Sequence, residues 1–525
     1  MNQKEVSKKY IPSGFDVEEH KNIFSFIVSK EEIGTVCQKL YFNDGLQLKT
    51  ITAIDEKKSF GRYRIFYVFG IPGENIFLAP YIVVKNSEEF PSITKIIHEA
   101  SSYERKIWSF FGLKPIEHPN LRGMLLHENW PNDVFPLRKD FDWRNRPKEA
   151  TGKYEFSKVD GEGIYEVPVG PVHAGIIEPG HFRFSVAGEE VLNLEAKLGY
   201  KHKGIEKLFE VFPMEEKLRL SERVSGDTSF THSMAFCQAI ESFADVCAPK
   251  RAQHLRMFFS EMERLTNHFN DIGFIMLDAG YSFGGSNCAR IREKIMQWNE
   301  KLTDSRFLRG VNVFGGVMKN ISAETCHKLK KDLEKIQKDF SQVISISGES
   351  SSLLNRLQST GKLDRQIAID HGVLGVAGRA IGLEHDARIE YPYADYASMH
   401  FEMALEKSGD VYARLHVRIK EVHSSMKILK QILDKLTEKE NSEIITEKEF
   451  VFAKNSLSIG IAEGWRGEIV YFVVTDEKGN ISRVDVRDPS FVNWTVLGYA
   501  GRDNIIPDFP LINKSFNLSY SGNDL

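Results

Sequence analysis

The stretch of residues 221–232, SERVSGDTSFTH, most constrains how this chain can fold, because it changes from a loop into a helix. Four residues that commonly cap helices lie within it: Ser225, Asp227, Thr228 and Ser229. Apolar residues then recur at helical spacing, namely Met234, Ala235, Phe236, Ala239, Ile240 and Phe243. The pattern predicts a helix N-terminus inside the protein, with the rest of the domain packed around it.

This stretch resembles the N-terminal metal-binding motif of the large subunit of nickel-iron hydrogenases. In that motif an arginine precedes a Cys-x-x-Cys pair at the head of a helix, whereas here Arg223 precedes Ser225 and Thr228. Thiolates are soft ligands that suit nickel and iron, and a neutral hydroxyl offers no anionic sulfur. The resemblance implies a retained scaffold whose two cysteine ligands are missing.

The second hydrogenase motif, Asp-Pro-Cys-x-x-Cys near the C-terminus, aligns with residues 517–522, NLSYSG, when Lys514-Ser515-Phe516 serves as the anchor. Its two thiolate positions are occupied by Ser519 and Gly522. A similar string at Asp488-Pro489-Ser490 belongs instead to an Arg-x-x-Ser-Phe element at residues 487–491 and is not a degraded ligand pair. We therefore predict that the chain binds no nickel or other metal.

Composition excludes several classes of protein. A chain of 525 residues has room for two or three domains, and a formal net charge of -4 without a basic stripe argues against nucleic-acid binding. No apolar run reaches the roughly 20 residues that span a bilayer, and residues 1–10 do not form a signal peptide. The five cysteines show no Cys-x-x-Cys spacing, so we expect reduced thiols in a cytoplasmic protein.

The first part of the chain is predicted to be a small α+β domain. Residues 61–70 and 77–84 have the pattern of strands, and a helix is expected to start at Pro91-Ser92 and to continue through Ile107 and Phe110. Residues 146–160 are polar and rich in turn-forming residues, which indicates a linker. We place the first domain at residues 1–145 and the second at 161–525.

The end of the first domain carries an ordered series of motifs: Glu104 to Trp108, Phe111-Gly112, His118 to Arg122, Trp130 and Pro136 to Phe141. This series resembles the small peripheral-arm subunit of complex I that packs beside the quinone-site subunit, and the hydrogenase-associated versions of that subunit. The resemblance covers about forty residues and implies that two subunits are fused in one chain.

The second domain is predicted to be a mainly helical bundle with flanking β hairpins, so the fold class is α+β. Glycine and proline residues punctuate a hairpin sheet over residues 170–191, amphipathic helices run to about Asp304 and again over residues 323–340, and a second hairpin spans residues 467–486. This domain resembles the large subunit of membrane-bound, energy-converting nickel-iron hydrogenases of the formate hydrogenlyase and hydrogenase-4 type. It is also similar to the quinone-site subunit of complex I.

The residues that hold quinone in complex I are replaced here. A histidine and a tyrosine of that subunit align with Ile177 and Gly226. An isoleucine side chain cannot form hydrogen bonds and a glycine has no side chain, so both proton donors are missing. Whether a quinone binds stays open at this point.

The polar residues that survive are candidates for proton transfer. They are Glu178, His173, Arg223, Asp227, His232, Arg379 and Asp386. By resemblance, Glu178 matches the proton-transfer carboxylate of hydrogenases, and we expect it to be buried, with a raised pKa unless Arg223 or Arg379 lies close. The alternative is that these charged groups only neutralise one another inside a helical domain.

Three functions remain possible from the sequence. The first is an electron-transfer subunit of a membrane-associated, complex I-like oxidoreductase that couples redox chemistry to ion translocation without a nickel-iron site. The second is an NADH- or formate-linked quinone reductase subunit with a repurposed site, and the third is a non-catalytic assembly or coupling scaffold. The chain would act only within a complex.

The resemblance also implies partners and a location. Expected partners are a small subunit that carries an iron-sulfur cluster, membrane antiporter-like and anchor subunits, and a quinone or a ferredoxin, while this chain itself binds no cofactor. We expect a peripheral position on the inner face of the cell membrane. We also expect an exposed apolar docking face formed by residues 170–184 and 223–236.

Overall fold

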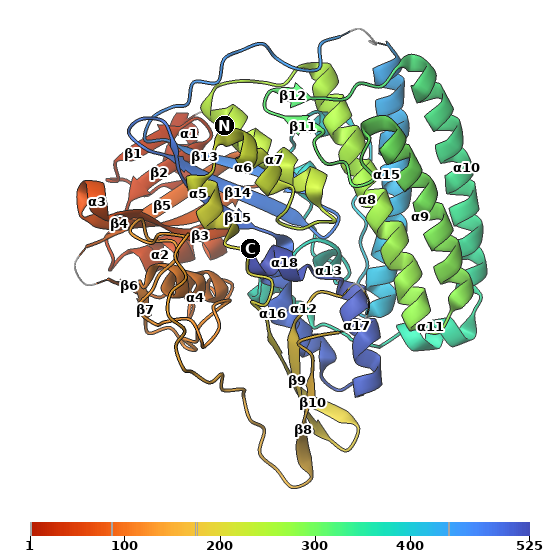
Figure 1. The fold of residues 1–525 in the computed structure, drawn as a ribbon, viewed down its shortest axis with the longest axis horizontal. Helices are drawn as coiled ribbons and strands as arrows, with labels where there is room; N and C mark the ends of the chain where they lie inside the picture. Colours follow the sequence, from red (N-terminus) through yellow and green to blue (C-terminus); the bar gives the residue numbers. More distant parts are fainter. Residues whose placement is uncertain (1–2, 86–87, 174, 176, 439–441) are drawn as a thin grey trace.

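The computed structural model describes residues 3–85, 88–173, 175, 177–438 and 442–525, and it confirms a mixed α+β fold (Figure 1). The first region contains α1 (Gln3–Tyr10), β1 (Val17–His20), β2 (Ile23–Ile27), α2 (Ile33–Gln38), the π-helical turn η1 (Lys39–Asn43), β3 (Gln47–Glu56), α3 (Lys57–Phe60), β4 (Arg62–Ile71), β5 (Ile76–Val84), β6 (Glu89–Pro91), α4 (Ala100–Phe111) and β7 (Lys114–Ile116). Strands β1 to β5 form one sheet in the order β1-β2-β5-β4-β3. Both strands predicted from the pattern are present, as β4 and β5.

The helix expected to begin at Pro91-Ser92 begins instead at Ala100. The side chain of Glu104 explains the difference, because its carboxylate accepts hydrogen bonds from the Ser92 hydroxyl at 2.5 Å and from the backbone N–H of Ile93 at 2.7 Å. These bonds hold residues 92 and 93 in a non-helical conformation, and a turn follows at residues 94–96. Ile93 and Ile97 are buried in the N-terminal core although neither residue is helical.

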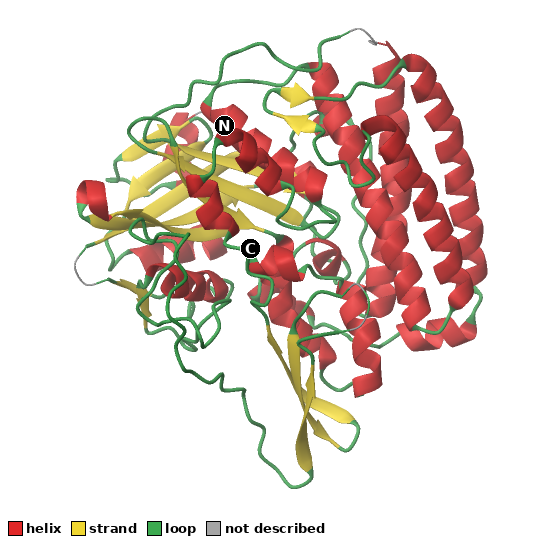
Figure 2. Cartoon of the chain, viewed as in Figure 1, coloured by secondary structure: helices red, strands yellow, loops and turns green. Residues whose placement is uncertain are grey.

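The middle region contains a small sheet followed by the helical bundle. Its elements are β8 (Ile164–Val169), β9 (His181–Ala187), β10 (Glu190–Lys197), α5 (Ile205–Val211), α6 (Met214–Ser221), α7 (Ser229–Phe243), α8 (Lys250–Asp278), α9 (Ser282–Thr303), β11 (Asn312–Val313), β12 (Gly316–Val317), α10 (Ala323–Gly348), α11 (Ser351–Leu357), α12 (Arg365–Asp370), α13 (Gly375–Arg379), α14 (Ala387–Glu390), the 3-10 turn η2 (Tyr396–Ser398) and α15 (Val411–Glu438). The long helices α8, α9, α10 and α15 pack side by side, and β8 to β10 project away from the body (Figures 1 and 2).

The last region of the chain packs against the first. It comprises β13 (Leu457–Glu463), β14 (Glu468–Thr475), β15 (Ile481–Arg487), α16 (Pro489–Gly501), the 3-10 turn η3 (Ile506–Asp508), α17 (Phe509–Phe516) and α18 (Tyr520–Asp524). The antiparallel sheet β13-β14-β15 contains the predicted hairpin, together with β13, which was not predicted. This sheet lies between the N-terminal sheet and α7 and shares a buried core with the former, where the rings of Phe66 and Phe472 are 5.7 Å apart.

Buried ion pairs join the first region to the last. Lys106 on α4 contacts Glu206 at 2.8 Å and Asp485 at 3.1 Å, and Lys49 on β3 contacts Glu468 at 2.7 Å. These side chains are buried, so each charge needs its partner to offset the cost of leaving water. The two regions therefore pack as one interlocked body.

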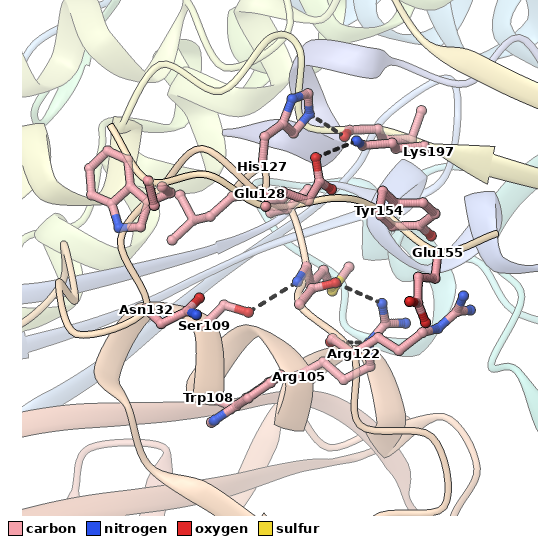
Figure 3. Close-up of a pocket in the computed structure, with 18 of the residues that line it drawn as sticks. Arg105, Trp108, Ser109, Arg122, His127, Glu128, Asn132, Tyr154, Glu155 and Lys197 are labelled. Atoms are coloured by element: carbon pink, nitrogen blue, oxygen red, sulfur yellow. Dashed lines mark hydrogen bonds and ion pairs between the residues drawn. The ribbon is translucent and has the colours of Figure 1, made fainter. Parts of the chain in front are cut away.

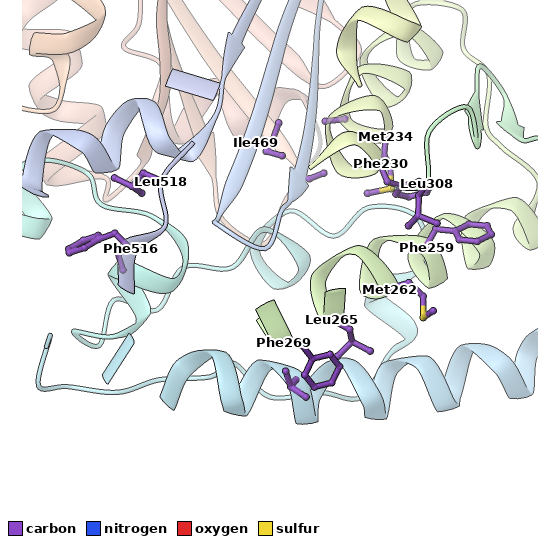
Figure 4. Close-up of a cluster of buried hydrophobic side chains, with 14 of the residues drawn as sticks. Phe230, Met234, Phe259, Met262, Leu265, Phe269, Leu308, Ile469, Phe516 and Leu518 are labelled. Carbon is purple, nitrogen blue, oxygen red and sulfur yellow. The ribbon is translucent and has the colours of Figure 1, made fainter. Parts of the chain in front are cut away.

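The core of the second domain encloses the start of α7. Phe230 and Met234 on α7 are fully buried and belong to the same apolar cluster as Phe259 on α8 (Figure 4). The expectation of an exposed apolar face over residues 223–236 is therefore wrong for the helical part of that stretch. The other half of the expected face is partly present, because Val172 and Ile177 in the loop between β8 and β9 are 84% and 54% exposed.

Candidate functional site

The fold brings together the two ends of the second domain that align with the two hydrogenase metal-binding motifs. The hydroxyl oxygens of Ser225 and Ser519 are 2.9 Å apart, although the residues are far apart in the sequence. Ser519 is the N-cap of α18, where its side chain accepts a hydrogen bond from the backbone N–H of Gly522 at 2.9 Å. Three of the four aligned positions thus meet directly, and Thr228 joins them through a shared partner, Asp227.

Asp227 organises these residues, which we call the Ser225 cluster: Ser225, Asp227, Thr228, Arg466, Ser519 and Gly522. Its Oδ1 accepts hydrogen bonds from the hydroxyls of Ser225 and Thr228, each at 3.0 Å. Arg466 pairs with both carboxylate oxygens, at 2.7 and 2.8 Å, and its guanidinium lies over the ring of Trp465 at 3.9 Å. Partial burial of this carboxylate opposes ionisation, but Arg466 outweighs it and lowers the pKa of Asp227 to about 2. The cluster therefore holds an ionised, neutralised pair at neutral pH.

The donor set does not fit a nickel-iron centre. The four aligned positions supply two serine hydroxyls, one threonine hydroxyl and a glycine, and Arg466 places a cation against them. Soft metals require anionic sulfur, and a guanidinium disfavours a second cation at the same place. Among the residues that the structure describes, no group of three or more His, Cys, Asp or Glu side chains could hold a metal ion.

His232 and Asp488 form a second polar unit beside the cluster. His232 Nε2 lies 3.1 Å from Asp488 Oδ2, and its Nδ1 lies 3.1 Å from the hydroxyl of Tyr471, all of them buried. Asp488 also accepts the N–H of Ser490 at 2.7 Å as the N-cap of α16. Burial opposes ionisation of Asp488, but the bond to His232 outweighs it and lowers the pKa of the carboxyl.

Glu178 reaches the cluster from the loop between β8 and β9. Its Oε2 accepts a hydrogen bond from the backbone N–H of Ser521 at 3.0 Å, and the Ser521 hydroxyl lies 3.4 Å from that of Ser519. The expectation of a buried carboxylate is wrong, because the Glu178 side chain is 35% exposed. Its cationic neighbour is Lys201, with Nζ 4.0 Å from Oε1.

Neither of the two arginines considered as neighbours of Glu178, Arg223 and Arg379, lies beside it. Arg223 is exposed, and its guanidinium donates to the carbonyl oxygen of Arg219 at 2.7 Å on its own side of the loop. His173 is half-buried, with Nε2 2.8 Å from the carbonyl oxygen of Gly180. Arg223 and His173 lie outside the Ser225 cluster.

Arg379 and Asp386 belong to a separate, deeply buried network. Arg379 contacts Glu421 at 2.8 Å, Glu463 at 2.9 Å and Asp386 at 3.9 Å, and Asp386 also pairs with Arg388 at 2.7 Å. The interpretation that these ions neutralise one another agrees with this arrangement. The complete network consists of Glu261, Arg264, His268, Arg379, Asp386, Arg388, Glu421 and Glu463.

The network touches the strand end that carries Arg466. Arg264 donates to the carbonyl oxygens of Glu463 and Gly464 at 2.6 and 3.0 Å. Four carboxylates face three guanidiniums, and burial raises the pKa of Glu463 to about 7. Burial also lowers the pKa of His268, so this ring does not supply the missing positive charge. The balance of charge favours a proton on Glu463 near neutral pH.

The cap of α7 is supplied by α8. Thr228 is the N-cap by position but makes no side-chain cap bond, and Glu263 accepts the N–H groups of Phe230 and Thr231 at 2.7 and 3.1 Å. Local caps were expected from the sequence. A carboxylate from another helix satisfies the same orphan donors, so sequence spacing alone could not identify it.

Sequence reasoning missed Arg466 and set Asp488 aside. Both lie next to a glycine or proline at the end of a strand, in Trp465-Arg466-Gly467 and Asp488-Pro489. A charged residue followed by a chain-reversing residue was the available signal. Only the fold shows that Arg466 lies beside Ser225 and that Asp488 lies beside Gly522.

The chain combines a small N-terminal sheet domain with an interlocked helical-bundle domain, and the polar centre of the second domain joins the two ends of that domain. This arrangement defines the class of hydrogenase large-subunit-like chains. Within it, the chain belongs to the family of respiratory-chain NADH dehydrogenase subunits, with the 30 Kd and 49 Kd types fused in one polypeptide. The family model for the 30 Kd subunit matches residues 26–147, and the model for the 49 Kd subunit matches residues 278–524.

Related proteins match most of the chain. Formate hydrogenlyase subunit 5 of Escherichia coli (strain K12) is 31% identical over 511 residues, which are 96% of this chain and 89% of the relative. Hydrogenase-4 component G of the same strain is 33% identical, over 93% of this chain and 86% of the relative. NADH-quinone oxidoreductase subunit 4 of Thermus thermophilus is 31% identical, over 67% of this chain and 92% of the relative.

A solved structure supports the same assignment. A chain of the membrane-bound sulfane sulfur reductase, an archaeal respiratory membrane complex, matches with a TM-score of 0.62 and 25% identity, covering 69% of this chain and 99% of that chain. In the described part of this chain, no helix is both long and apolar enough to cross a membrane.

Proposed function

We propose that this chain is a subunit of a membrane-associated, complex I-like oxidoreductase, in which it shapes the redox site beside an electron-carrying partner without holding nickel and iron itself. The named relatives are subunits of formate hydrogenlyase, hydrogenase-4 and NADH-quinone oxidoreductase. The observation that carries the metal-free part of the proposal is the ion pair of Asp227 and Arg466 among Ser225, Thr228 and Ser519.

In this proposal the cluster handles protons and charge rather than a metal. Ser225 and Ser519 form a hydroxyl pair that both donates and accepts hydrogen bonds, and the Ser521 hydroxyl extends it toward Glu178. Glu178, partly open to solvent, is placed to exchange protons with water. Arg466 neutralises Asp227 and would stabilise negative charge that develops next to the cluster.

Electrons must come from a partner, because hydroxyls, carboxylates and guanidiniums carry none at ordinary potentials. We propose that a small subunit with an iron-sulfur cluster packs near the loop of Val172 and Ile177, whose exposed apolar side chains lie on the same loop as Glu178. Membrane antiporter-like and anchor subunits would attach this assembly to the inner face of the cell membrane. A quinone or a ferredoxin is the proposed redox partner.

The test is to purify the intact complex and to measure turnover with NADH, formate, reduced ferredoxin and quinones, together with hydrogen evolution. The proposal expects electron transfer between one of these donors and an acceptor without hydrogen production. Hydrogen evolution that depends on nickel would contradict the metal-free site. A complex with no redox activity toward any of these compounds would instead support a scaffold.

A further inference from the structure

A large cavity lies at the junction of the two domains, and none of its lining residues belongs to the Ser225 cluster. Its volume is about 760 Å³, within the range of small-molecule sites. One wall is the face of α4 that carries Ser102, Arg105 and Ser109, and the opposite wall is formed by the end of β10 and by α16. The linker segment 150–155 forms a further side, called the roof here, from which Tyr154 and Glu155 are labelled in Figure 3.

Two arginines reach this cavity, and only one carboxylate neutralises them. Arg105 donates to the backbone carbonyl oxygens of Arg122 and Gly123 at 3.0 and 3.1 Å, and no described carboxylate lies within ion-pair distance of it. Arg122 pairs with Glu195 at 2.8 Å, while its Nε is buried without a hydrogen-bond partner. Burial, and then the charge of Arg122, lower the pKa of Arg105. An anion in the cavity would satisfy this excess of donors and of positive charge.

The other charged groups around the cavity do not supply that anion. Lys197 is already paired with Glu128 at 2.7 Å. Lys153 and Glu155, both exposed on the roof, offset each other in charge. Across the lining and Glu195, four cations stand against three carboxylates, which leaves one positive charge on the side of Arg105.

Aromatic side chains are concentrated in the same cavity. Trp108, Trp130 and Trp494 line it, which is half of the six tryptophans of the chain, and Tyr154 joins them from the roof. Tryptophan and tyrosine rings offer flat apolar surface to which planar groups stack. A ligand with a planar ring and an acidic group would therefore use both features of the lining.

The roof and Ser157, just beyond it, are hydrogen-bonded to Glu195 on β10. The hydroxyl of Tyr154 donates to Glu195 at 2.7 Å, and the backbone N–H of Ser157 donates to the other oxygen of Glu195 at 2.8 Å. The same carboxylate pairs with Arg122. These hydrogen bonds thus hold the linker in place as one side of the cavity.

We propose that this cavity is a binding site for a nucleotide-sized anion, whose phosphate or carboxylate pairs with Arg105 and Arg122 and whose planar ring lies against the tryptophans. This proposal does not rest on the redox function proposed above, since the cavity and the Ser225 cluster have no residue in common, although they are in contact where Trp494 donates to the carbonyl oxygen of Ser519 at 3.2 Å. Its position between the domains would make the ligand stabilise their junction.

The test is isothermal titration calorimetry of the full-length chain with four probes: adenosine monophosphate, flavin mononucleotide, adenosine and inorganic phosphate. At least one mononucleotide should bind with a Kd below about 1 mM. Adenosine, which lacks the anion, and phosphate, which lacks the ring, should each bind at least tenfold more weakly. Failure of both mononucleotides to bind, or equal binding of adenosine, overturns the proposal.

Two variants locate the site. Arg105→Gln keeps a donor for the carbonyl oxygens but removes the charge, and it should raise the Kd at least tenfold. The matched control Arg290→Gln removes an exposed arginine of α9 and should leave the Kd unchanged. Thr151→Trp, on the exposed roof, should block the cavity without lowering the melting temperature. Unchanged binding in either Arg105→Gln or Thr151→Trp overturns the proposal.

Discussion

The carboxylate of Asp488 occupies the space that a side chain at Gly522 would need. A Cβ built on Gly522 would lie 2.6 Å from Cγ and Oδ2 of Asp488, well inside van der Waals contact. Asp488 cannot retreat easily, because it is bonded to His232 and caps α16. The absence of a cysteine at position 522 is therefore accompanied by a neighbour that fills its place.

This relationship predicts the effect of a small side chain at position 522. Gly522→Ala should lower the free energy of unfolding by about 1–3 kcal/mol, the usual cost of overpacking, as measured by urea denaturation. Gly348→Ala is a matched control, since that glycine is also helical and a Cβ at its position would have no atom within 4 Å. A loss of stability in Gly348→Ala as large as in Gly522→Ala would contradict the steric argument.

The purified protein should contain no stoichiometric nickel. Ser225, Thr228, Ser519 and Gly522 offer no thiolate, and Arg466 brings a positive charge to the same place. Elemental analysis of the protein from nickel-supplemented cells checks this expectation. About one nickel per chain would show that other residues hold the metal.

Asp227 should be needed to keep Arg466 in place. Asp227→Asn removes the charge but keeps the shape, and it should destabilise the protein by about 1–2 kcal/mol, a value reduced by the partial exposure of the carboxylate. Asp434→Asn, which alters an exposed pair with Lys330, serves as the control and should cost less than about 1 kcal/mol. Equal stability of Asp227→Asn and the wild type would refute a structural role for this pair.

Glu463 should make stability depend on pH. Its pKa rises from 4.5 to about 7 on folding because of burial, so the folded state binds the proton more tightly. The resulting stabilisation is complete below about pH 4.5 and is lost as the pH rises to about 7, by roughly 3 kcal/mol as an order of magnitude. Above that window the curve should be flat with respect to this group.

Glu463→Gln should remove this contribution, so the unfolding free energy of the wild type should fall by roughly 3 kcal/mol relative to that of the variant as the pH rises from about 4.5 to about 7. Denaturation series at several pH values measure that difference. Glu334→Gln, at an exposed position on α10, should show a constant difference from wild type. A constant difference for Glu463→Gln as well would mean that the proton resides elsewhere in the network.

Glu178 is the residue on which proton exchange with the cluster should depend. Glu178→Gln keeps the acceptor for the Ser521 N–H but cannot titrate, so turnover or coupled ion transport by the complex should fall about 10²-fold or more. Glu189→Gln, in the exposed turn between β9 and β10, is the control and should leave turnover unchanged. Full activity of Glu178→Gln would show that protons take another route.

Local sequence pattern was sufficient to predict many of the helices and strands. The hairpin of β14 and β15, the strands β4 and β5 and the helices of the bundle follow from local alternation and helical spacing, which depend on which side of an element faces the core. The absence of a cysteine at positions 225 and 519 can likewise be read directly from the sequence.

The way in which the polar residues combine depended on tertiary packing. Arg466 joins Asp227, Asp488 fills the space at Gly522, Glu263 caps α7, and Arg379 lies in a network away from Glu178. Each of these contacts links segments that are distant along the chain, and its formation depends on which strand ends and helices pack together. Buried charges need partners, but a sequence states only which charges exist and not which of them will be neighbours.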